Sequence, residues 1–447
     1  MNESGMTSIL IRNGTILTMN PAREILSGDL LVQDGRIAEV PARSRSADLV
    51  IDATGKLVLP GFIQVHAHLN QTLFRGMADD MDVVDWLRLR IWPLERAHTP
   101  ESIYASARLS IAEMVRGGTT TAVTMESLNY TEAAFEAAAE MGFRAVIGNA
   151  MMDRWEVGTE MIGESADIAL SKSLELLKRY DHSANDRLRF AFCPRGTRNA
   201  TDELWREVAR LARERKTLIH THAAENRAQS ERLAAFGGHE VYYLNDMGVV
   251  GRNLVIAHGV WLEPGELDLL GKAGATVAHC PSANLKLASG VAPVPEMMAK
   301  GINVALGGDG APCNNNLDAF TEMRLAALIH KPRCGPRSMP AATVLEMLTV
   351  NGARAAGLEN EIGSLEPGKR ADLILLNRDG LHAWPSLAAS PVSQVVYEHH
   401  ASDVNTVMID GQVLLDQGQF TRWDAGEIRE GSQRALRNLL ERNPGLV

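Results

Sequence analysis

One unit recurs along the middle of this chain: an amphipathic helical pattern, a glycine, and then a short apolar or β-branched run. Glycines at 117–118, 142, 274 and 301 each stand directly before such a run. A helix that ends at glycine and is followed by a strand is the expected junction of alternating α/β structure. Candidate strands lie near 57–65, 119–124, 143–148, 188–193, 217–222, 254–258, 275–279 and 302–308. Eight such units predict an α/β fold, the (β/α)8 TIM barrel.

Both ends of the chain carry a different, β-rich pattern. A turn is predicted at Asn13–Gly14, and Asp34–Gly35 and Asp410–Gly411 separate apolar runs, which is a strong hairpin signal. The 447 residues exceed the roughly 250–300 at which a single core stops growing, so more than one domain is expected. We predict a composite β-sandwich domain from 1–59 and 362–424, a barrel over 60–361, and a C-terminal helix over 425–447.

The composition limits which kinds of partner and site the chain is expected to have. The net charge of −10 and the lack of a basic run disfavour nucleic acid, and no apolar run approaches the roughly 20 residues of a membrane helix. The four cysteines form no CxxC pair, so neither a cysteine-built zinc site nor a disulfide framework is expected. Residues 1–8 are polar and lack a signal pattern, which favours a cytoplasmic location. We also expect a homo-oligomer.

Two histidines follow the first candidate strand of the barrel. His66 and His68 are two positions apart, so their side chains point to the same side of an extended chain, the barrel interior. Two imidazoles on one side can hold one metal ion. The alternative is a pair of buried, hydrogen-bonded histidines, and ligand-type residues at three further strand ends favour the metal.

The fifth candidate strand also ends in histidines. His220 and His222 share one face, so the period alone does not decide which of them is a ligand. His222 lies nearer the strand end and has Glu225 three residues on, so we assign His222 to the metal. His220, one layer deeper, is expected to fill the barrel or support a ligand. Glu225 is either a solvated carboxylate at a helix start or, beside a ligand, a proton-transfer group.

Three later strand ends add further polar groups. His258 ends the sixth strand and Asp309 the eighth, although an aspartate there could also cap the next helix. Three histidines, a carboxylate and an open water position fit a catalytic Zn²⁺ or Fe²⁺ site. His279, at the end of the seventh strand, either contacts substrate or packs in the core. The fourth strand ends with Arg195 where a bridging lysine would stand, which favours a single metal.

These motifs together resemble the amidohydrolase superfamily. The resemblance covers nearly the whole chain, through Pro-Gly-Phe before His66-Ala-His68, His222-Ala-Ala-Glu225, Ala-His258-Gly, His279-Cys-Pro-Ser-Ala-Asn, Asp309-Gly-Ala and the stretch 363–373. Within the superfamily, the chain is similar to the branch of S-adenosylhomocysteine, methylthioadenosine and 5'-deoxyadenosine deaminases and triazine hydrolases. The resemblance implies a composite β-sandwich from both termini beside the barrel.

The resemblance also implies roles for the site residues. His66, His68, His222 and Asp309 would bind the metal. Glu225 would act as the proton shuttle, and His258 as the hydrogen-bonding partner of the attacking water.

Substrate contacts are implied as well. Glu95 matches a glutamate that grips ribose hydroxyls in the nucleoside deaminases. The chain departs from homocysteine-accepting relatives at Arg195, where they have histidine, and at Asn149, where they have arginine. Arg195, Arg154 and Arg198 are the candidates to replace these residues in binding a homocysteine carboxylate.

Trp86, Trp92, Leu73 and Phe74 lie in the long segment after the first strand. They form a lid over an aromatic substrate or pack in the core.

The predicted function is hydrolytic deamination of an adenine nucleoside or a related amino-substituted N-heterocycle at one divalent metal, Zn²⁺ or Fe²⁺. Displacement of chloride or an alkylamine from an s-triazine, and guanine-type deamination, are the nearest alternatives because they use the same groups. A cyclic-amide hydrolase is disfavoured by the missing lysine, and a non-catalytic scaffold by the complete ligand set.

Overall fold

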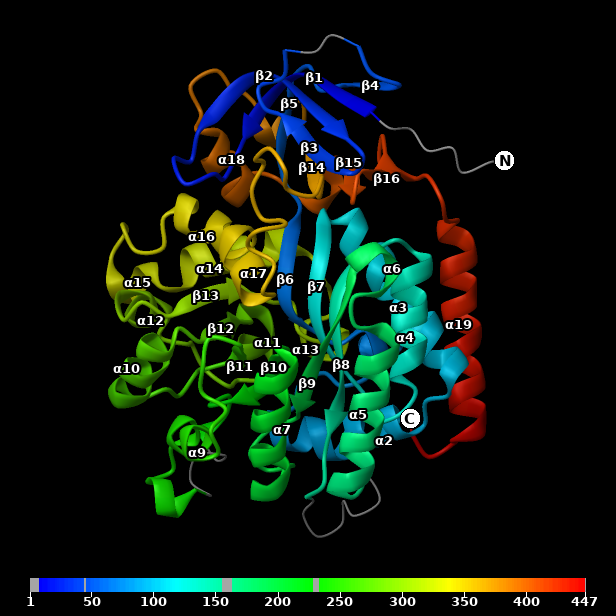
Figure 1. Ribbon diagram of the computed structural model, residues 1–447, viewed down its shortest axis with the longest axis vertical. Helices are drawn as coiled ribbons and strands as arrows, with labels where there is room; N and C mark the ends of the chain where they lie inside the picture. The colour runs from blue at the N-terminus through cyan, green and yellow to red at the C-terminus, as the bar shows by residue number, and fades with distance from the viewer. Residues whose placement is uncertain (1–7, 44–45, 155–162, 228–232, 447) are drawn as a thin grey trace.

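The computed structural model describes residues 8–43, 46–154, 163–227 and 233–446. The polar residues 1–7 and the last residue of the predicted C-terminal helix lie outside these ranges. The described strands form two sheets, a parallel barrel and a mixed sheet that caps one end of it (Figure 1). Both parts of the predicted architecture are confirmed, while the exact domain limits stay a prediction.

The barrel contains eight parallel strands in sequence order. A bridge between Ala67 and Asp309 joins the last strand to the first and so brings the two edges together. The strands are β6 (Phe62–Ala67), β7 (Thr119–Glu126), β8 (Arg144–Met151), β9 (Leu188–Pro194), β10 (Leu218–Ala223), β11 (Leu254–His258), β12 (Thr276–His279) and β13 (Asn303–Leu306).

Helices cover the outside of the barrel, and none of the described helices is long and apolar enough to cross a membrane. They are α1 (Val83–Asp85), α2 (Trp92–Arg96), α3 (Pro100–Arg116), α4 (Thr131–Glu140), α5 (Ala166–Tyr180), α6 (Ser183–Asp186), α7 (Asp202–Arg215), α9 (Glu240–Asp246), α10 (Pro264–Ala273), α11 (Pro281–Lys286), α12 (Val294–Ala299), α13 (Ala311–Asn314), α14 (Ala319–Ile329), α15 (Lys331–Cys334), α16 (Ala341–Met347), α17 (Val350–Ala355), α18 (Pro391–Tyr397) and α19 (Ala425–Arg442).

The mixed sheet draws its nine strands from both ends of the chain. Its order is β17-β16-β15-β14-β5-β1-β2-β3, with β4 paired to β1. The N-terminal strands are β1 (Ser8–Leu17), β2 (Ile25–Gln33), β3 (Arg36–Glu39), β4 (Leu49–Asp52) and β5 (Lys56–Pro60), and the C-terminal ones are β14 (Leu373–Asn377), β15 (Val404–Ile409), β16 (Gln412–Asp416) and β17 (Gln419–Phe420). The two ends are joined where β14 pairs with β5.

The predicted first barrel strand, 57–65, is in fact two strands of different sheets. Its first part is β5 of the mixed sheet and its second part is β6 of the barrel, with Gly61 between them. The Gly61 N–H donates to Asp372 O of the mixed sheet, whereas the Phe62 N–H donates to Gly118 O beside the barrel. The apolar pattern runs on through both strands because each is buried, so periodicity alone does not reveal the change of sheet.

The predicted turn at Asn13–Gly14 is also wrong. Strand β1 continues through these residues, and the register against β2 shifts between Ile11 and Gly14, which is a β-bulge. Asn13 has a φ of 59°, the left-handed conformation that asparagine tolerates in bulges as well as in turns. The hairpin turns at Asp34–Gly35 and Asp410–Gly411 are confirmed between β2 and β3 and between β15 and β16.

Alternate residues of the barrel strands face two separate cores. Val146 and Ala150 of β8 belong to the cluster inside the barrel. Ile147 and Met151 of the same strand belong to the cluster between the barrel and its helices. This alternation decides which residue types at a strand end can reach the site.

Candidate functional site

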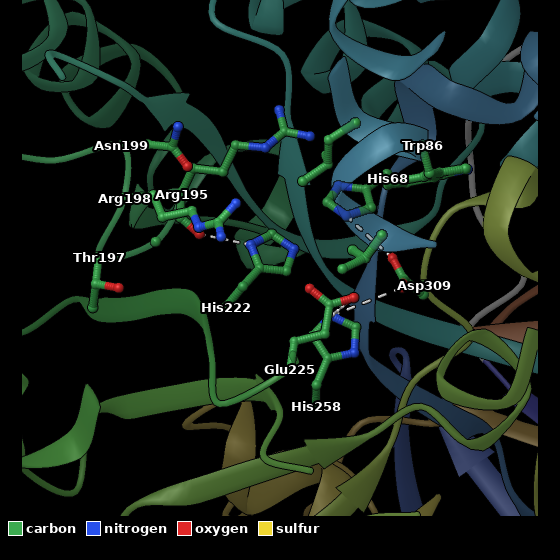
Figure 2. A pocket seen from close by; sticks show the side chains of 13 residues that line it. His68, Trp86, Arg195, Thr197, Arg198, Asn199, His222, Glu225, His258 and Asp309 are labelled. Carbon is green, nitrogen blue, oxygen red and sulfur yellow. Dashed lines mark hydrogen bonds and ion pairs between the residues drawn. The ribbon is translucent and has the colours of Figure 1, made fainter. Parts of the chain in front are cut away.

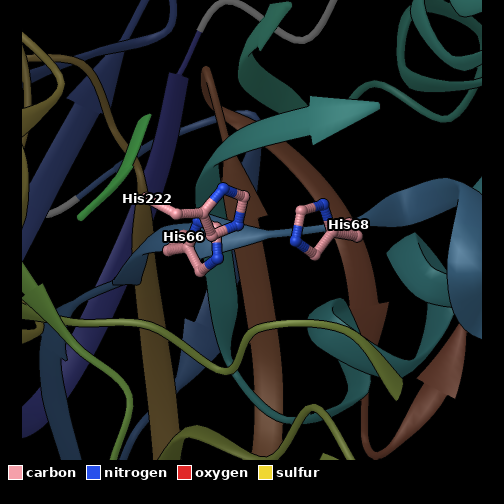
Figure 3. Close-up of side chains that lie close together, drawn as sticks. All are labelled: His66, His68 and His222. Atoms are coloured by element: carbon pink, nitrogen blue, oxygen red, sulfur yellow. The ribbon is translucent and has the colours of Figure 1, made fainter. Parts of the chain in front are cut away.

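The predicted histidines and carboxylates converge at the ends of four barrel strands. His66 lies on β6 and His68 directly after it, His222 lies on β10, and His258 ends β11. Asp309 follows β13, three residues after Leu306. Figure 3 shows His66, His68 and His222 with their rings turned toward one another. The structure therefore brings together side chains that are up to 243 residues apart in sequence (309 − 66).

The donor atoms are close enough to share one ion. The ring nitrogens of His66, His68 and His222 all lie within 4.8 Å of one another, and His66, His258 and Asp309 form a second such group. Asp309 Oδ1 is 3.3 Å from His66 Nε2 and 3.2 Å from His68 Nε2. A compact set of imidazole nitrogens and one carboxylate is the donor set of a catalytic zinc or iron site.

The outer nitrogen of each clustered histidine is held by another group. His68 Nδ1–H donates to Met125 O at 2.5 Å, and His222 Nδ1–H donates to Arg195 O at 2.7 Å. His66 Nδ1 lies 2.8 Å from His220 Nε2, so His220 supports a candidate ligand from one layer deeper. These contacts leave each Nε2 lone pair directed at the shared centre, as metal-binding histidines require.

Burial and charge adjust these groups for metal binding. Burial lowers the pKa of His66 to about 4 and that of His222 well below its ordinary value, so both imidazoles are neutral at neutral pH. Burial would raise the pKa of Asp309, but His66 and His68 outweigh it and hold that pKa well below the usual range. His66 Nε2 is buried and has no hydrogen-bond partner in the described chain. At His68 burial lowers the pKa, but the contact with Asp309 outweighs burial and raises it. Neutral His66 and His222, an ionised Asp309 and the unsatisfied nitrogen of His66 fit a divalent cation.

Glu225 and His258 stand beside the histidine cluster. Glu225 Oε1 is 3.7 Å from His258 Nε2, and that nitrogen is 3.9 Å from Asp309 Oδ2. His258 Nδ1–H donates to Asn284 Oδ1 at 2.9 Å, which orients the ring with Nε2 toward Glu225. Burial raises the pKa of Glu225, so this carboxyl holds a proton more readily than an exposed glutamate does.

The backbone is unusual at the same place. Ala224, His258 and Asp309 have φ values of 52°, 76° and 60°. Side chains other than glycine seldom adopt this left-handed conformation, which costs of order 1–3 kcal/mol and persists where the surrounding structure enforces it. Each of the three residues lies at the end of a barrel strand, so the strain is concentrated around the histidine cluster.

A pocket opens above the cluster (Figure 2). Trp86 forms part of one wall, together with Val83 and Leu87, and residues 195–199 form the other. Trp86 lies at the start of a π-helical segment, Trp86–Ile91, and its buried indole N–H has no partner among the described residues. His68, His222, Glu225, His258 and Asp309 all line the pocket.

Arg195 and Glu95, both predicted to bind substrate, form an ion pair with each other. Arg195 Nη1 donates to Glu95 Oε2 at 2.7 Å, and Gln71 Nε2 donates to Glu95 Oε1 at 2.8 Å. Both members of the ion pair are buried. Arg195 lines the pocket. Glu95 lies on α2 and contacts the guanidinium of Arg195.

Asn149 is not brought to this pocket. It shares the parity of Ile147 and Met151, which face the helix layer, and its Oδ1 accepts a hydrogen bond from Ser173 Oγ of α5 at 2.9 Å. A residue one position away on β8 would face the barrel interior. The resemblance implied a substrate contact for Asn149, and the face on which this residue lies does not support one.

Trp92 and His279 also lie away from the pocket wall. Trp92 packs into the cluster inside the barrel, six residues after Trp86. His279 is buried next to His330, with ring centroids 5.7 Å apart, and burial lowers its pKa to about 3. The lid residues Leu73 and Phe74, predicted beside Trp92, pack against Leu439 of α19. Of the predicted lid, Trp86 alone reaches the pocket.

Several wall residues were not predicted from the sequence. Thr197 and Asn199 line the pocket, as do Val83 and Leu87, whereas Arg198, a candidate for binding a substrate carboxylate, lines it as well. Thr197 and Asn199 follow the fourth barrel strand, so the rule that the loop after each barrel strand builds the site could have found them. Val83 and Leu87 lie in a helical segment whose apolar pattern is that of ordinary packing, and no sequence signal separates them from core residues.

The fold and the site together define a barrel hydrolase with a histidine-rich metal centre. A family model, the amidohydrolase family, matches residues 57–414. The chain belongs to this family, and the predicted resemblance is confirmed.

Curated relatives match almost end to end. The 5'-deoxyadenosine deaminase of Methanothermobacter thermautotrophicus is 39% identical over 97% of this chain and 99% of the relative. The 5-methylthioadenosine/S-adenosylhomocysteine deaminase of Thermococcus onnurineus is 38% identical over 91% of this chain and 94% of the relative. A crystal structure of an adenosine deaminase from Xanthomonas campestris with bound zinc superposes with a TM-score of 0.90, at 30% identity, over 97% of this chain and 98% of that one.

Proposed function

We propose that this protein is a metal-dependent aminohydrolase that converts the 6-amino group of an adenine nucleoside to an oxo group and releases ammonia. The observation that carries the proposal is the convergence of His66, His68, His222 and Asp309 with Glu225 beside them in one pocket. Full-length similarity to enzymes named as adenosine-type deaminases supports the choice of substrate.

His66, His68, His222 and Asp309 are the residues that would hold the metal, and zinc is the ion we propose. When bound, a divalent metal lowers the pKa of water from near 16 toward ~7 and so supplies a nucleophile at neutral pH. The unpartnered Nε2 of His66 and the Nδ1 hydrogen bonds of His68 and His222 favour these residues as ligands.

The remaining steps are proton transfers by this chain's own residues. Asp309 accepts a proton from the attacking water. Glu225, whose pKa is raised by burial, donates a proton to the ring nitrogen next to the amino-bearing carbon, which makes that carbon accept the attack. His258 Nε2 hydrogen-bonds the added oxygen. Asp309 passes the proton that it accepted to the amino group, the C–N bond breaks and ammonia leaves, and the proton of the added hydroxyl returns to Glu225 as the carbon–oxygen double bond forms.

Ribose recognition is assigned to Glu95. Arg195, Gln71 and Asn70 each occupy one hydrogen-bonding position on its carboxylate, and a carboxylate offers about four, so capacity remains for a sugar hydroxyl. Arg195 uses one of its five N–H donors on Glu95, and its charge is already balanced there, so it attracts a homocysteine carboxylate less than an unpaired arginine does. We therefore propose 5'-deoxyadenosine, methylthioadenosine or adenosine as better substrates than S-adenosylhomocysteine.

An ammonia-release and ultraviolet-shift panel tests the proposal. Zinc-loaded protein would be incubated with adenosine, 5'-deoxyadenosine, methylthioadenosine, S-adenosylhomocysteine, guanine, cytosine, melamine and atrazine. Turnover of the adenine nucleosides with one metal per chain is expected. Turnover of none of the eight compounds would reject the proposal, and preferential turnover of guanine or atrazine would replace it with another reaction of the same site. Light scattering of the same sample tests the predicted homo-oligomer.

A further inference from the structure

Glu240 is a buried glutamate outside the pocket that contacts two segments of its wall. It lies at the start of α9, and only 2% of the residue is exposed. Its Oε1 accepts a hydrogen bond from Thr197 Oγ1 at 2.7 Å, and its Oε2 accepts one from the Ala224 N–H. No lysine or arginine of the described chain forms an ion pair with it. Burying a carboxylate without a cationic partner costs free energy, so we expect this one to stabilise the positions of the groups that it contacts.

The first of these groups, the Ala224 N–H, belongs to the segment that carries the proposed proton-transfer residue, Glu225. Ala224 directly precedes Glu225 and has the left-handed φ of 52°. Its carbonyl accepts from the backbone N–H of Trp261 at 2.9 Å, so Glu240 holds the peptide group before Ala224 and the loop after β11 holds the one after it. An alanine in this conformation stays there only while such contacts enforce it. The direction of the Glu225 side chain depends on that backbone.

The second group, the Thr197 hydroxyl, belongs to the pocket wall formed by residues 195–199. Thr197 lies in the stretch 195–199, which lines the pocket and includes Arg195 and Arg198. The carbonyl of Arg195 also accepts the Nδ1–H of His222. Glu240 therefore links the segment that carries Glu225 to the wall segment 195–199, and the hydrogen bond between His222 and Arg195 O joins the same two segments.

We propose that Glu240 is a positioning residue that holds Glu225 at proton-transfer distance from a substrate seated against residues 195–199. The proposal rests on the function proposed above, because it assigns Glu225 to proton transfer. Proton transfer requires the donor and acceptor within hydrogen-bond reach, and a displacement of about 1 Å can cost about 100-fold in rate. Removing Glu240 therefore affects the chemical step more than it affects substrate binding.

The test compares three variants of the full-length, zinc-loaded protein. Glu240→Ala removes both acceptors, and kcat for 5'-deoxyadenosine is expected to fall about 10- to 100-fold while KM changes less than about 3-fold and the metal content stays at the wild-type value. Glu240→Gln keeps an acceptor for the Ala224 N–H and can donate to Thr197 Oγ1, so kcat is expected within about 5-fold of wild type.

Glu266→Ala is the matched control. Glu266 is 1% exposed and accepts from the Val241 N–H at 2.9 Å, so its loss also removes a buried carboxylate next to α9, without touching either wall segment. We expect a lower Tm and a kcat within about 2-fold of wild type. Equal losses of kcat in the two alanine variants, or a loss in Glu240→Ala that follows its metal content, would overturn the proposal, as would an unchanged kcat in Glu240→Ala.

Hydrogen–deuterium exchange separates this inference from the proposed function. In Glu240→Ala, amides of 195–199 and 223–225 are expected to exchange at least about 10-fold faster than in wild type, and in Glu266→Ala they are not. If the wild-type protein deaminates none of the nucleosides, the proposed function fails and exchange alone decides whether Glu240 orders the two segments. Unchanged exchange in Glu240→Ala rejects the positioning role.

Discussion

At the scale of single residues, the proposed chemistry depends most directly on Glu225. Glutamine has the same shape but no acidic proton, so Glu225→Gln is expected to lower kcat about 10²- to 10⁴-fold. The metal content is expected to stay unchanged, because Glu225 is not one of the proposed ligands. Steady-state deamination and metal analysis measure both quantities. Glu207→Gln, at a surface position on α7, serves as the control. More than a tenth of the wild-type rate in Glu225→Gln would remove Glu225 from the mechanism.

A second buried carboxyl makes stability depend on pH. Burial raises the pKa of Glu322, on α14, to about 7 from an ordinary value of 4.5. Below 4.5 the carboxyl is protonated in both folded and unfolded chains. Between 4.5 and 7 the unfolded chain ionises while the folded chain keeps the proton, so stability falls as pH rises through this window. Above it, both forms are ionised and the burial cost is fully present.

Glu322→Gln isolates that contribution, since glutamine is neutral throughout. Between about pH 5.5 and pH 8 the free energy of unfolding of the variant is expected to gain about 2 kcal/mol relative to wild type. Denaturant unfolding of the holoprotein at the two pH values measures the change. Glu430→Gln, at an exposed site on α19, is expected to show a difference of only a few tenths of a kcal/mol. A wild-type-like pH dependence in Glu322→Gln would contradict the assignment.

At the scale of elements, Gly61 lets the chain pass from the mixed sheet into the barrel. A Cβ at this position would lie 2.2 Å from Oγ1 and Cγ2 of Thr120, which is far inside van der Waals contact. Gly61→Ala is therefore expected to destabilise the fold by about 1–3 kcal/mol. The control is Gly431→Ala inside α19, where a Cβ meets nothing within 4 Å and a gain of about 0.5–1 kcal/mol is expected. Thermal and denaturant unfolding measure both, and equal effects would contradict the steric argument.

Some of these structural elements could be predicted from the sequence, and others could not. The barrel and the histidine cluster were predictable, because strand order and the rule of strand ends place His66, His222 and Asp309 together. The change of sheet at Gly61 was not, since burial on both sides removes the alternating pattern. The bulge at Asn13–Gly14 was not either, because the same dipeptide suits both turns and bulges.

Side-chain partners were the least predictable part of the site. The ion pair between Arg195 and Glu95 joins a residue that follows β9 to a residue on α2, and local sequence carries no record of such a contact. Asn149 lies on the face of β8 that is turned toward the helix layer, and side chains alternate between the two faces of a strand. Substrate specificity depends on these distant contacts, so the sequence identified the chemistry better than the substrate.

At the scale of the whole molecule, Arg144 joins the barrel to the mixed sheet. It begins β8 and donates to both oxygens of Asp372, just before β14, at 2.6 and 3.0 Å. The pair is almost fully buried, and Asp410 lies 3.8 Å from the same guanidinium. Arg144→Met leaves Asp372 buried without its cation, which is expected to cost about 3–5 kcal/mol. Asp410 keeps an ion pair with Arg370 at 2.6 Å.

Denaturant unfolding measures the effect of this substitution. Arg210→Met is the control, since Arg210 pairs with Glu207 and Glu214 on the exposed face of α7 and its loss is expected to cost less than about 1 kcal/mol. Replacing both partners, as Arg144→Met with Asp372→Leu, is expected to recover part of the loss, because no carboxylate at 372 is then left unpaired. A cost below 1 kcal/mol for Arg144→Met alone would contradict a structural role for the pair.

Backbone carbonyls orient two of the clustered histidines, and this affects how substitutions can change the site. His68 and His222 are held by the carbonyls of Met125 and Arg195, which every amino acid possesses. No point substitution can delete these acceptors. Substitutions at residue 195 can therefore alter the pocket wall while the ring of His222 keeps its partner. The backbone of the barrel therefore sets the orientation of His68 and His222, whereas His66 depends on the side chain of His220. The pocket wall can change toward new substrates while the rings of His68 and His222 keep their partners.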